Sequence, residues 1–429
     1  MRYFLLFAFV FQLLPSLADV QAGNPLTAAA DQRIAPVLEK VVAWRRDIHE
    51  HPELSNREFR TSALVAEHLE ALGLEVTTGV AHTGVVGILR GQADQPVVAL
   101  RADMDALPVS EQVDLPFASR AMGLYQGKEV GVMHACGHDN HVAILMGAAE
   151  VLAGMREQIP GTIKFIFQPA EEGPPEGEEG GASMMIEQGV LAGVDAIFGL
   201  HVGPLPLGMI AYRPGQFMAS ADRFHIVVNG SQTHGAMPWA GIDPVVVGSQ
   251  IVLGLQTIAS RQVDVTLTPS IVTVGRFSAG VRNNIIPDSA ELEGTIRTFD
   301  EGVRQQIHDR IRRTAASIAE SAGATATVTI DRGPPVTANN EALTARMAPT
   351  LKRVAMDNMA VESDRLTTAE DFGDYQQVIP GLFFFLGVAD PDQKAPAPNH
   401  SPYFYADERA LPVGVRAMTH LALDYLAGP

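Results

Sequence analysis

The stretch VMHACGHDNH at residues 132–141 holds the only cysteine of the 429-residue chain and three of its 13 histidines. Cys136 and His138 stand two residues apart, and a thiolate and an imidazole are both good ligands for zinc and neighbouring divalent metals. Gly137 between them frees the backbone to turn, so that both side chains can converge. The stretch therefore predicts part of a metal site.

A helix is expected directly after this stretch, where residues 142–155 are largely apolar. Asp139 and Asn140 are predicted to cap it, because their side chains can accept hydrogen bonds from free backbone N–H groups. Taken alone, the pattern fits a buried free cysteine beside a capped helix equally well, since a short motif often occurs without function. The choice depends on ligand side chains elsewhere.

Length and composition predict a globular protein of two domains, because 429 residues exceed what one hydrophobic core usually holds. The net charge of −18 argues against nucleic acid or an anionic membrane surface as the main partner. A single cysteine excludes an internal disulfide. A small-molecule substrate remains the expected partner.

The N-terminus has the pattern of a secretory signal peptide at residues 1–18. Arg2 precedes an apolar run over residues 3–14, and small residues follow, which predicts cleavage after Ala18 or, as a second possibility, after Ala22. The run is short for a transmembrane helix of about 20 residues, although an uncleaved anchor is the alternative. We therefore expect a secreted, periplasmic protein without stable membrane insertion after cleavage.

Near-continuous apolar runs between helical patterns predict an α/β fold with a buried, mostly parallel central sheet. The expected strands are residues 85–89, 97–100, 163–167, 196–200 and 382–386. In open α/β sheets, ligands bind outside the carboxyl ends of the strands. The polar residues that follow these strands are Asp103, Asp105, Glu171, Glu172 and His201.

A second pattern interrupts this fold and predicts an inserted ferredoxin-like α+β domain, because its elements follow the order β-α-β-β-α-β. The expected elements are residues 223–228, 244–260, 270–277, 290–298, 302–321 and 325–330. We therefore expect a catalytic domain in two parts, residues 31–213 and 332–429, around an insertion at 214–331. An acidic loop at 171–181 is expected to be solvated at Glu176, Glu178 and Glu179.

Five candidate ligands of mixed S, N and O type suit two divalent ions that share a bridge. They are Cys136, His138, Glu172, His201 and His400. This donor set permits zinc or manganese, and also cobalt or nickel. A lone histidine is more often structural, but the five together favour a metal centre.

Glu171 and Glu172 indicate the chemistry. Adjacent side chains of an extended segment point opposite ways, so one carboxylate can bind metal while the other faces a metal-bound water. Such a carboxylate can take a proton from that water and return it to a leaving nitrogen. The alternative is two solvated acids at the head of the acidic loop.

Several motifs together resemble the M20 family of metallopeptidases, and more narrowly its amidohydrolase subfamily of hippurate hydrolases, aminoacylases and indole-acetyl-amino-acid hydrolases. The motifs are RRDIHEHPELS (45–55), LRADMDALP (100–108), MHACGHDNH (133–141), FQPAEEG (167–173), GLHV (199–202), THGAMPWAGIDPV (233–245), NNIIPD (283–288), AEDF (369–372) and NHSP (399–402). The resemblance implies a zinc-peptidase-like catalytic domain with a ferredoxin-like lid and dimerisation domain. It also implies a homodimer or higher homo-oligomer that cleaves the amide of N-acyl amino acids.

By the same resemblance the five candidates are the metal ligands, Glu171 is the general base, and Asp105 supports a metal-ligating histidine. His234 matches the histidine that contacts the substrate near the scissile carbonyl, often across a dimer interface. Asn284 and Arg297 match residues that hold the substrate carboxylate. The chain departs from the family pattern just before His234, where Gln232-Thr233 replaces a common Gly-Gly.

Other functional classes find less support. A non-catalytic binding protein of the same fold would be favoured by loss of Glu171 or of a ligand, and none is lost. A serine hydrolase needs a G-x-S-x-G elbow, and a nucleotide enzyme needs a phosphate-binding loop; the sequence contains neither. Within the metal-dependent class, a carboxypeptidase or dipeptidase is the alternative.

Overall fold

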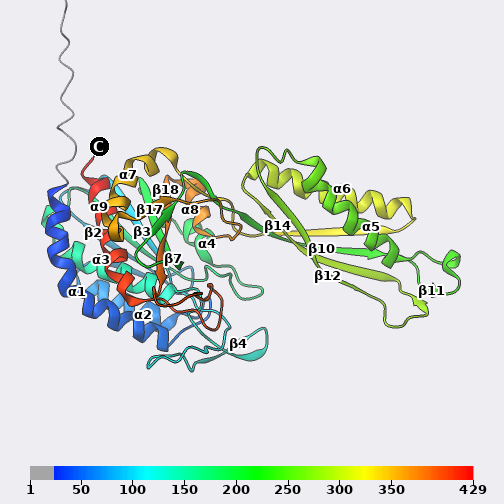
Figure 1. Ribbon diagram of the computed structural model, residues 1–429, viewed down its shortest axis with the longest axis horizontal. Helices are drawn as coiled ribbons and strands as arrows, with labels where there is room; N and C mark the ends of the chain where they lie inside the picture. Colours follow the sequence, from blue (N-terminus) through cyan, green and yellow to red (C-terminus); the bar gives the residue numbers. More distant parts are fainter. Residues whose placement is uncertain (1–23, 429) are drawn as a thin grey trace, which may run out of the picture.

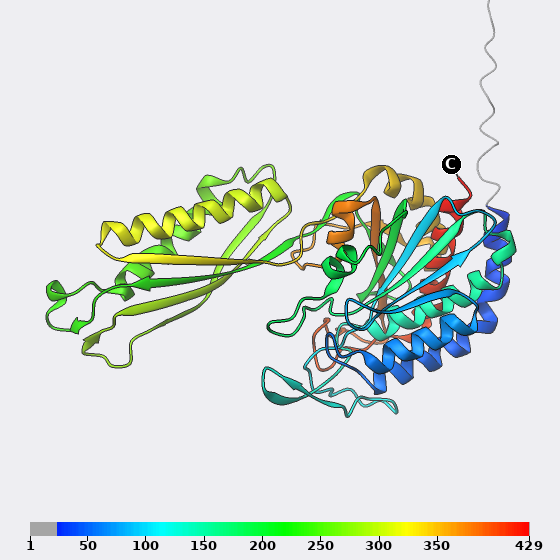
Figure 2. The ribbon, with the colours of Figure 1, turned by 180° about the vertical axis from the view of Figure 1, so that it is seen from behind.

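The structure is a computed structural model that describes residues 24–428 (Figure 1). The predicted signal peptide at residues 1–18 lies outside this range. Two lobes are joined end to end, and the catalytic lobe contains both ends of the described chain (Figures 1 and 2). Among the helices between residues 24 and 428, none is both long and apolar enough to cross a membrane.

The larger lobe is built on an eight-stranded sheet of order β1-β2-β6-β3-β7-β18-β8-β17. Its central strands β6, β3, β7 and β18 are parallel, whereas β1, β2 and β8 pair antiparallel with β2, β6 and β18 respectively. The strands are β1 (Glu75–Val80), β2 (Gly84–Arg90), β3 (Val97–Asp103), β6 (Thr162–Gln168), β7 (Ala196–Pro206), β8 (Ile210–Tyr212), β17 (Ala360–Glu362) and β18 (Gly381–Ala389). The mostly parallel sheet predicted from the apolar runs is confirmed.

Helices cover both faces of this sheet because its strands are apolar on both sides. In β3, Val98 and Leu100 enter one core, whereas Val97 and Ala99 enter the other. The helices of the first core are α1 (Pro25–Glu50), α2 (Phe59–Ala71), α3 (His138–Ala153), α7 (Glu341–Val354) and α9 (Leu411–Leu426). Those of the second are α4 (Gly181–Glu187) and α8 (Phe372–Val378).

Helix α3 begins earlier than the sequence predicted. Gly137 is its N-cap with a φ of 95°, a left-handed conformation that favours glycine, and no side chain caps the helix. The predicted capping by Asp139 and Asn140 is wrong, because both residues lie inside the first turn. The Asp139 carboxylate instead binds Arg45 Nε at 2.9 Å and His49 Nδ1 at 2.8 Å.

The smaller lobe, here called the lid domain, is a four-stranded antiparallel sheet of order β12-β14-β10-β15. This is the strand order of a ferredoxin-like unit. Its elements are β10 (Ser220–Asn229), α5 (Pro244–Thr257), β12 (Ser270–Ala279), β14 (Ser289–Thr298), α6 (Glu301–Ser321) and β15 (Thr325–Arg332). Both helices pack on the sheet around their own hydrophobic core.

The chain enters and leaves the lid domain at one place. Strand β9 (Gly215–Met218) precedes the lid domain in the chain, and strand β16 (Thr337–Asn339) follows it; the two strands pair with each other. Phe217 and Met218 are buried in a core of the catalytic domain, so the chain departs after Met218 rather than near residue 214. Ala221 closes the junction, since its N–H donates to the Pro334 carbonyl at 3.1 Å and its carbonyl accepts from Gly333 N at 3.0 Å.

Two small two-stranded sheets lie outside the main sheets of the lobes. The pair β4 (Met122–Tyr125) and β5 (Lys128–Gly131) projects from the catalytic domain just before the cysteine stretch. The pair β11 (Thr233–His234) and β13 (Ile285–Ile286) forms the outer end of the lid domain, far from the catalytic domain (Figure 1).

Candidate metal centre

The five predicted ligands converge at the carboxyl ends of the central strands. Their backbones come from the loop before α3, its first turn, the turn after β6, strand β7 and the loop after β18. His400, in the last loop, has a φ of 68°, and its N–H donates to the Ala135 carbonyl at 2.8 Å. Asn399 Nδ2 donates to the Cys136 carbonyl at 2.9 Å, which fixes that loop against the cysteine.

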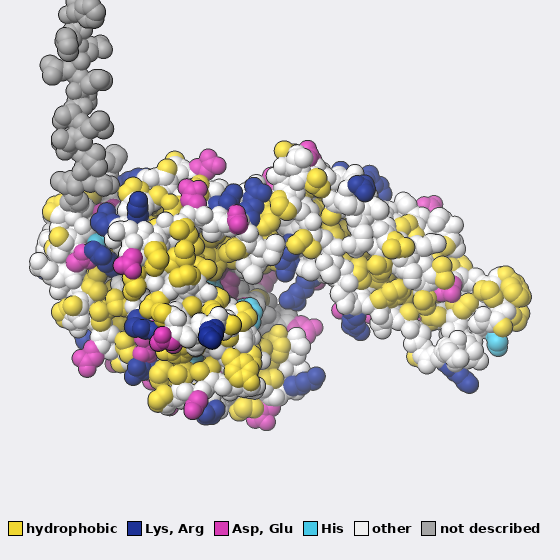
Figure 3. Space-filling view, viewed as in Figure 1, with side chains coloured by type: hydrophobic (Ala, Val, Ile, Leu, Met, Phe, Trp, Pro, Cys, Tyr) yellow, Lys and Arg dark blue, Asp and Glu magenta, His cyan; other side chains and the backbone are white. Residues whose placement is uncertain are grey.

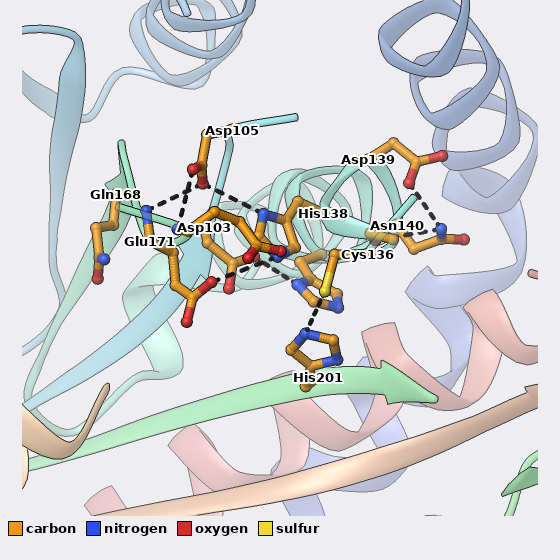
Figure 4. A network of polar contacts seen from close by, with 12 residues as sticks. Asp103, Asp105, Cys136, His138, Asp139, Asn140, Gln168, Glu171 and His201 are labelled. Atoms are coloured by element: carbon orange, nitrogen blue, oxygen red, sulfur yellow. Dashed lines mark hydrogen bonds and ion pairs between the residues drawn. The ribbon is translucent and has the colours of Figure 1, made fainter. Parts of the chain in front are cut away.

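Cys136 stands between two sets of ligands. Its Sγ lies 3.2 Å from His201 Nε2 and 3.3 Å from His400 Nε2 (Figure 4 shows the first contact). His400 Nε2 is also 3.1 Å from Glu172 Oε1. One group of potential ligands joins Cys136 with His138 and His201, and a second joins it with Glu172 and His400. The Cys136 sulfur is therefore a potential ligand in both groups.

His201 is in the protonation state that a metal ligand needs, whereas the Cys136 thiol would lose its proton only to a bound cation. His201 Nδ1 lies 2.7 Å from the Val202 carbonyl, an arrangement that places the proton there and leaves a lone pair on Nε2. Burial lowers the pKa of His201, so the ring is neutral. Burial and the neighbouring Glu172 and Glu171 carboxylates raise the pKa of the Cys136 thiol. A cation would reverse that effect, because a bound thiol loses its proton.

Asp105 lies directly behind the ring of His138. Asp105 Oδ1 lies 3.3 Å from His138 Nδ1, and His138 Nε2 is buried without a hydrogen-bond partner. Burial opposes protonation of His138, but the Asp103 and Asp105 carboxylates raise its pKa to about 10. A bound cation would replace the proton on this orphaned nitrogen, and the carboxylate behind the ring would orient it as a metal ligand.

Glu171 and Glu172 lie in a turn and not in the extended segment that the sequence predicted. Ala170, directly before them, has a φ of 53°. The two carboxylates therefore face the same cluster, and Glu171 Oε2 lies 3.9 Å from His138 Nε2. Burial, Glu370 and Glu172 raise the pKa of Glu171 well above its ordinary value. A raised pKa suits a carboxylate that takes and returns protons.

A buried ionic network behind the site was not assigned a role from the sequence. Arg101 Nη1 binds Asp103 at 2.6 Å, and its Nη2 lies 3.0 Å from Glu370 and 2.8 Å from Asp371. Asp371 also accepts the Ala182 N–H at 2.8 Å. The motifs LRADMDALP and AEDF contain these residues, but only the fold brings the two motifs together.

His141 belongs to the cysteine stretch, yet its ring has no free nitrogen. Its Nδ1 lies 2.5 Å from Asp103 Oδ1, and its Nε2 accepts the Val202 N–H at 2.8 Å. The ring is thus a neutral bridge between strand β3 and strand β7. We infer that it fixes the strand that carries His201 and is not itself a ligand.

The acidic loop lies at the surface and is tied down by one ion pair. Glu178 forms a surface ion pair with Arg57 Nη2 at 2.5 Å and accepts a hydrogen bond from Asn56 Nδ2 at 3.1 Å, and its side chain is 31% exposed. Glu176 and Glu179 are exposed, as expected. The pairing fastens the outer part of the loop to the turn between α1 and α2.

The lid residues are not brought to the metal centre in this conformation. His234 is exposed in β11 at the outer end of the lid domain (Figure 1). Asn284 lies beside it, since the Gly235 N–H donates to the Asn284 carbonyl at 2.8 Å. Arg297 lies at the other end of the lid sheet, opposite Ala221 at the junction with the catalytic domain.

Comparison with known proteins identifies the family. The model of peptidase family M20/M25/M40 matches residues 99–424, most of the chain. The chain belongs to the M20 peptidase family. The resemblance seen in the motifs is confirmed.

Relatives within the M20 family cover nearly the whole chain. A thermostable carboxypeptidase 2 of Saccharolobus solfataricus is 43% identical, over 91% of this chain and 97% of its own. An N-acetylcysteine deacetylase of Bacillus subtilis is 40% identical, over 90% of this chain and 97% of its own. A Bacillus subtilis structure described as a dinuclear metal-binding M20 peptidase has a TM-score of 0.78 and 37% identity, over 92% of this chain and 99% of that one.

The M20 assignment and the ligand cluster together define the enzyme class. The chain is a metal-dependent amidohydrolase or peptidase, a hydrolase of linear amide bonds. Its mixed α/β fold agrees with that of the solved M20 structure.

Proposed function

We propose that this M20 enzyme hydrolyses the amide bond of N-acyl amino acids, with Glu171 as general base, in the periplasm. The observation that carries the proposal is the placement of Glu171, a largely buried carboxyl with a raised pKa, beside the donor cluster around Cys136. Secretion rests on the sequence of residues 1–18 alone.

Two divalent ions fit the donors, one with His138 and His201 and the other with Glu172 and His400, with Cys136 common to both. Zinc or manganese is proposed, with cobalt and nickel also compatible. When bound, such ions lower the pKa of a coordinated water and polarise a carbonyl group. The protein's own part is to hold the ligands and to move the proton.

Glu171 moves that proton. Its carboxylate takes a proton as the water attacks the carbonyl carbon, and gives it to the nitrogen as the C–N bond breaks. Asp105 keeps Glu171 in place, because its Oδ1 accepts the Glu171 N–H at 3.1 Å. The products are a carboxylic acid and a free amino acid.

The proposed substrate class has a feature that the substrates of a carboxypeptidase and of an N-acetyl amino acid deacetylase have in common. The curated relatives include a carboxypeptidase and a deacetylase of an N-acetyl amino acid. An N-acyl amino acid and the end of a peptide both place an amide one carbon from a free carboxylate. Asn284 and Arg297 are proposed to hold that carboxylate from different subunits, because Asn284 lies at the outer end of the lid domain and Arg297 at its junction with the catalytic domain. Carboxypeptidase activity on short peptides is the second candidate, favoured by the first relative.

A substrate panel separates the two candidates. We expect metal-loaded enzyme to cleave N-acetyl and N-benzoyl amino acids with a higher kcat/KM than dipeptides with the same C-terminal residue. The amino group of a dipeptide is charged, and no acidic side chain is assigned to receive it. A preference for dipeptides across the panel would favour the second candidate. Cleavage of neither class would reject the proposal.

His234 is proposed to act at the scissile carbonyl of a partner subunit. Within one chain it is at the far end of the lid domain from the metal centre (Figure 1). Hydrophobic side chains gather at that end (Figure 3), where Met237, Trp239 and Val281 are 46%, 79% and 97% exposed. A second copy of the chain would cover such a surface. The histidine would then donate a hydrogen bond to the developing oxyanion.

Subunit mixing tests this placement. His234→Ala should lower turnover by about 10²–10³, the loss seen when one oxyanion donor is removed, with unchanged metal content. Mixed with Glu171→Gln protein, it should regain part of the activity, because one site of the heterodimer has both residues intact. No gain despite demonstrated subunit exchange would reject the cross-subunit arrangement. Full activity of His234→Ala alone would reject any role.

A further inference from the structure

The backbone N–H groups of residues 170–172, at the glutamate turn, all donate hydrogen bonds to buried carboxyl groups. The Ala170 N–H donates to Glu58 Oε1 at 3.0 Å. The N–H groups of Glu171 and Glu172 donate to the two oxygens of Asp105, each at 3.1 Å. Successive N–H groups of this kind form a concave site for negative charge. In this protein the carboxyl groups of Glu58 and Asp105, which come from two other segments of the chain, occupy that site.

The turn depends on an unfavourable conformation at Ala170. Its φ of 53° is left-handed, a conformation that is unfavourable for alanine relative to the right-handed form. Such a conformation persists only where surrounding contacts over-determine it. Ala170 is 2% exposed, and a Cβ on Gly180 would lie 3.2 Å from the Ala170 Cβ. The neighbourhood is therefore closely packed.

Glu58 is the side chain that reaches the backbone of Ala170. It lies just before α2 and is fully buried. Its Oε2 accepts a hydrogen bond from the Thr83 hydroxyl at 2.5 Å. None of its hydrogen bonds goes to a candidate metal ligand. A buried carboxyl group is costly unless it is hydrogen-bonded, so its two contacts explain how it is retained.

The left-handed residue decides where the two glutamates point. In an extended backbone, adjacent side chains diverge to opposite sides. With the turn at Ala170, both carboxylates instead face His138, and Glu171 Oε2 comes within 3.9 Å of its Nε2. A contact that holds Ala170 left-handed thus controls both the proposed base and one proposed ligand.

We propose that Glu58 is a positioning residue that holds Ala170 in the left-handed conformation and so aims Glu171 and Glu172 at the metal centre. This inference rests on the proposed function, since it assumes the roles given to the two glutamates. Glu58 itself touches neither the substrate nor a metal ion.

A rescue experiment tests the proposal. Glu58→Ala should weaken metal binding by about 10–100-fold, the usual cost of removing support from a ligand, and lower turnover with it. Glycine adopts positive φ without steric cost. Ala170→Gly in the same chain should therefore recover at least about tenfold of the lost affinity. Metal affinity is measured by competition with a chelator, and turnover with an N-acyl amino acid.

Matched variants separate positioning from general stability. Ala170→Gly alone should stay close to the wild type. Glu58→Gln should retain metal, because its amide oxygen can still accept the Ala170 N–H. Burial and the Asp105 carboxylate raise the pKa of Glu58 to about 8, so a neutral amide resembles the group it replaces. Loss of metal in Glu58→Gln would overturn the proposal.

Two further outcomes are decisive. If Ala170→Gly gives no recovery in folded Glu58→Ala protein, Glu58 does not act through Ala170, and the proposal is overturned. If Glu58→Ala does not fold, Thr83→Val takes its place, because it removes only the hydroxyl that steadies Glu58. Normal activity in Glu171→Gln would instead reject the proposed function, while recovery of metal affinity would still support the positioning role.

Discussion

Glu171→Gln is expected to lower turnover by at least about 100-fold, the scale of a positioned acid–base group, while the metal content stays unchanged. Glutamine preserves the size of the side chain but cannot take a proton from water. Glu171 lies 3.9 Å from His138 Nε2 and is not in either ligand set around Cys136. The measurements are kcat with an N-acyl amino acid and metal per subunit.

Glu176→Gln provides the control for this experiment. Glu176 lies in the same acidic loop but is exposed, so its loss should leave kcat unchanged. Near-normal activity of Glu171→Gln with full metal content would remove Glu171 from the mechanism. A variant that loses metal as well would make Glu171 a ligand instead.

Arg101→Met is expected to destabilise the catalytic domain by about 3–5 kcal/mol, as found when one partner of a buried ion pair is removed. The guanidinium contacts Asp103, Glu370 and Asp371, and its side chain is fully buried. Methionine would fill much of the space but deprive three carboxyl groups of the guanidinium that they share. Urea unfolding followed by circular dichroism measures the loss.

Arg276→Met is the matched control, because Arg276 forms an ion pair with Glu293 on the exposed face of the lid sheet, with 60% of its side chain accessible. Exposed pairs contribute about 0–1 kcal/mol, so this change should barely move the unfolding curve. Equal effects of the two changes would show that the buried network adds no more stability than a surface pair.

Much of the fold could be predicted because the responsible residues are local. Runs such as Val97–Leu100 are apolar at every position, which indicates a strand buried on both faces. Glu172 and His201 follow strands that the pattern already placed side by side in one sheet. Their convergence needed only the rule that parallel strands end together.

The remaining features depend on contacts between distant segments. The left-handed Ala170 is set by Glu58, 112 residues away, so no local pattern predicts the turn after it. Aspartate is a residue type that often caps helices, but the Asp139 carboxylate binds Arg45 and His49 instead of the helix N-terminus. The distance of His234 from the metal centre is a property of the whole lid domain, which a motif does not contain.

The junction of the lid domain bears on how the protein was assembled. Its entry and exit strands meet at Ala221, which exchanges hydrogen bonds with Gly333 and Pro334. An insertion whose ends already touch can be acquired or lost in one genetic event, because a short turn would bridge the gap. The catalytic strands on either side would keep their register. The lid domain is in this sense a module that evolution could exchange without rebuilding the host.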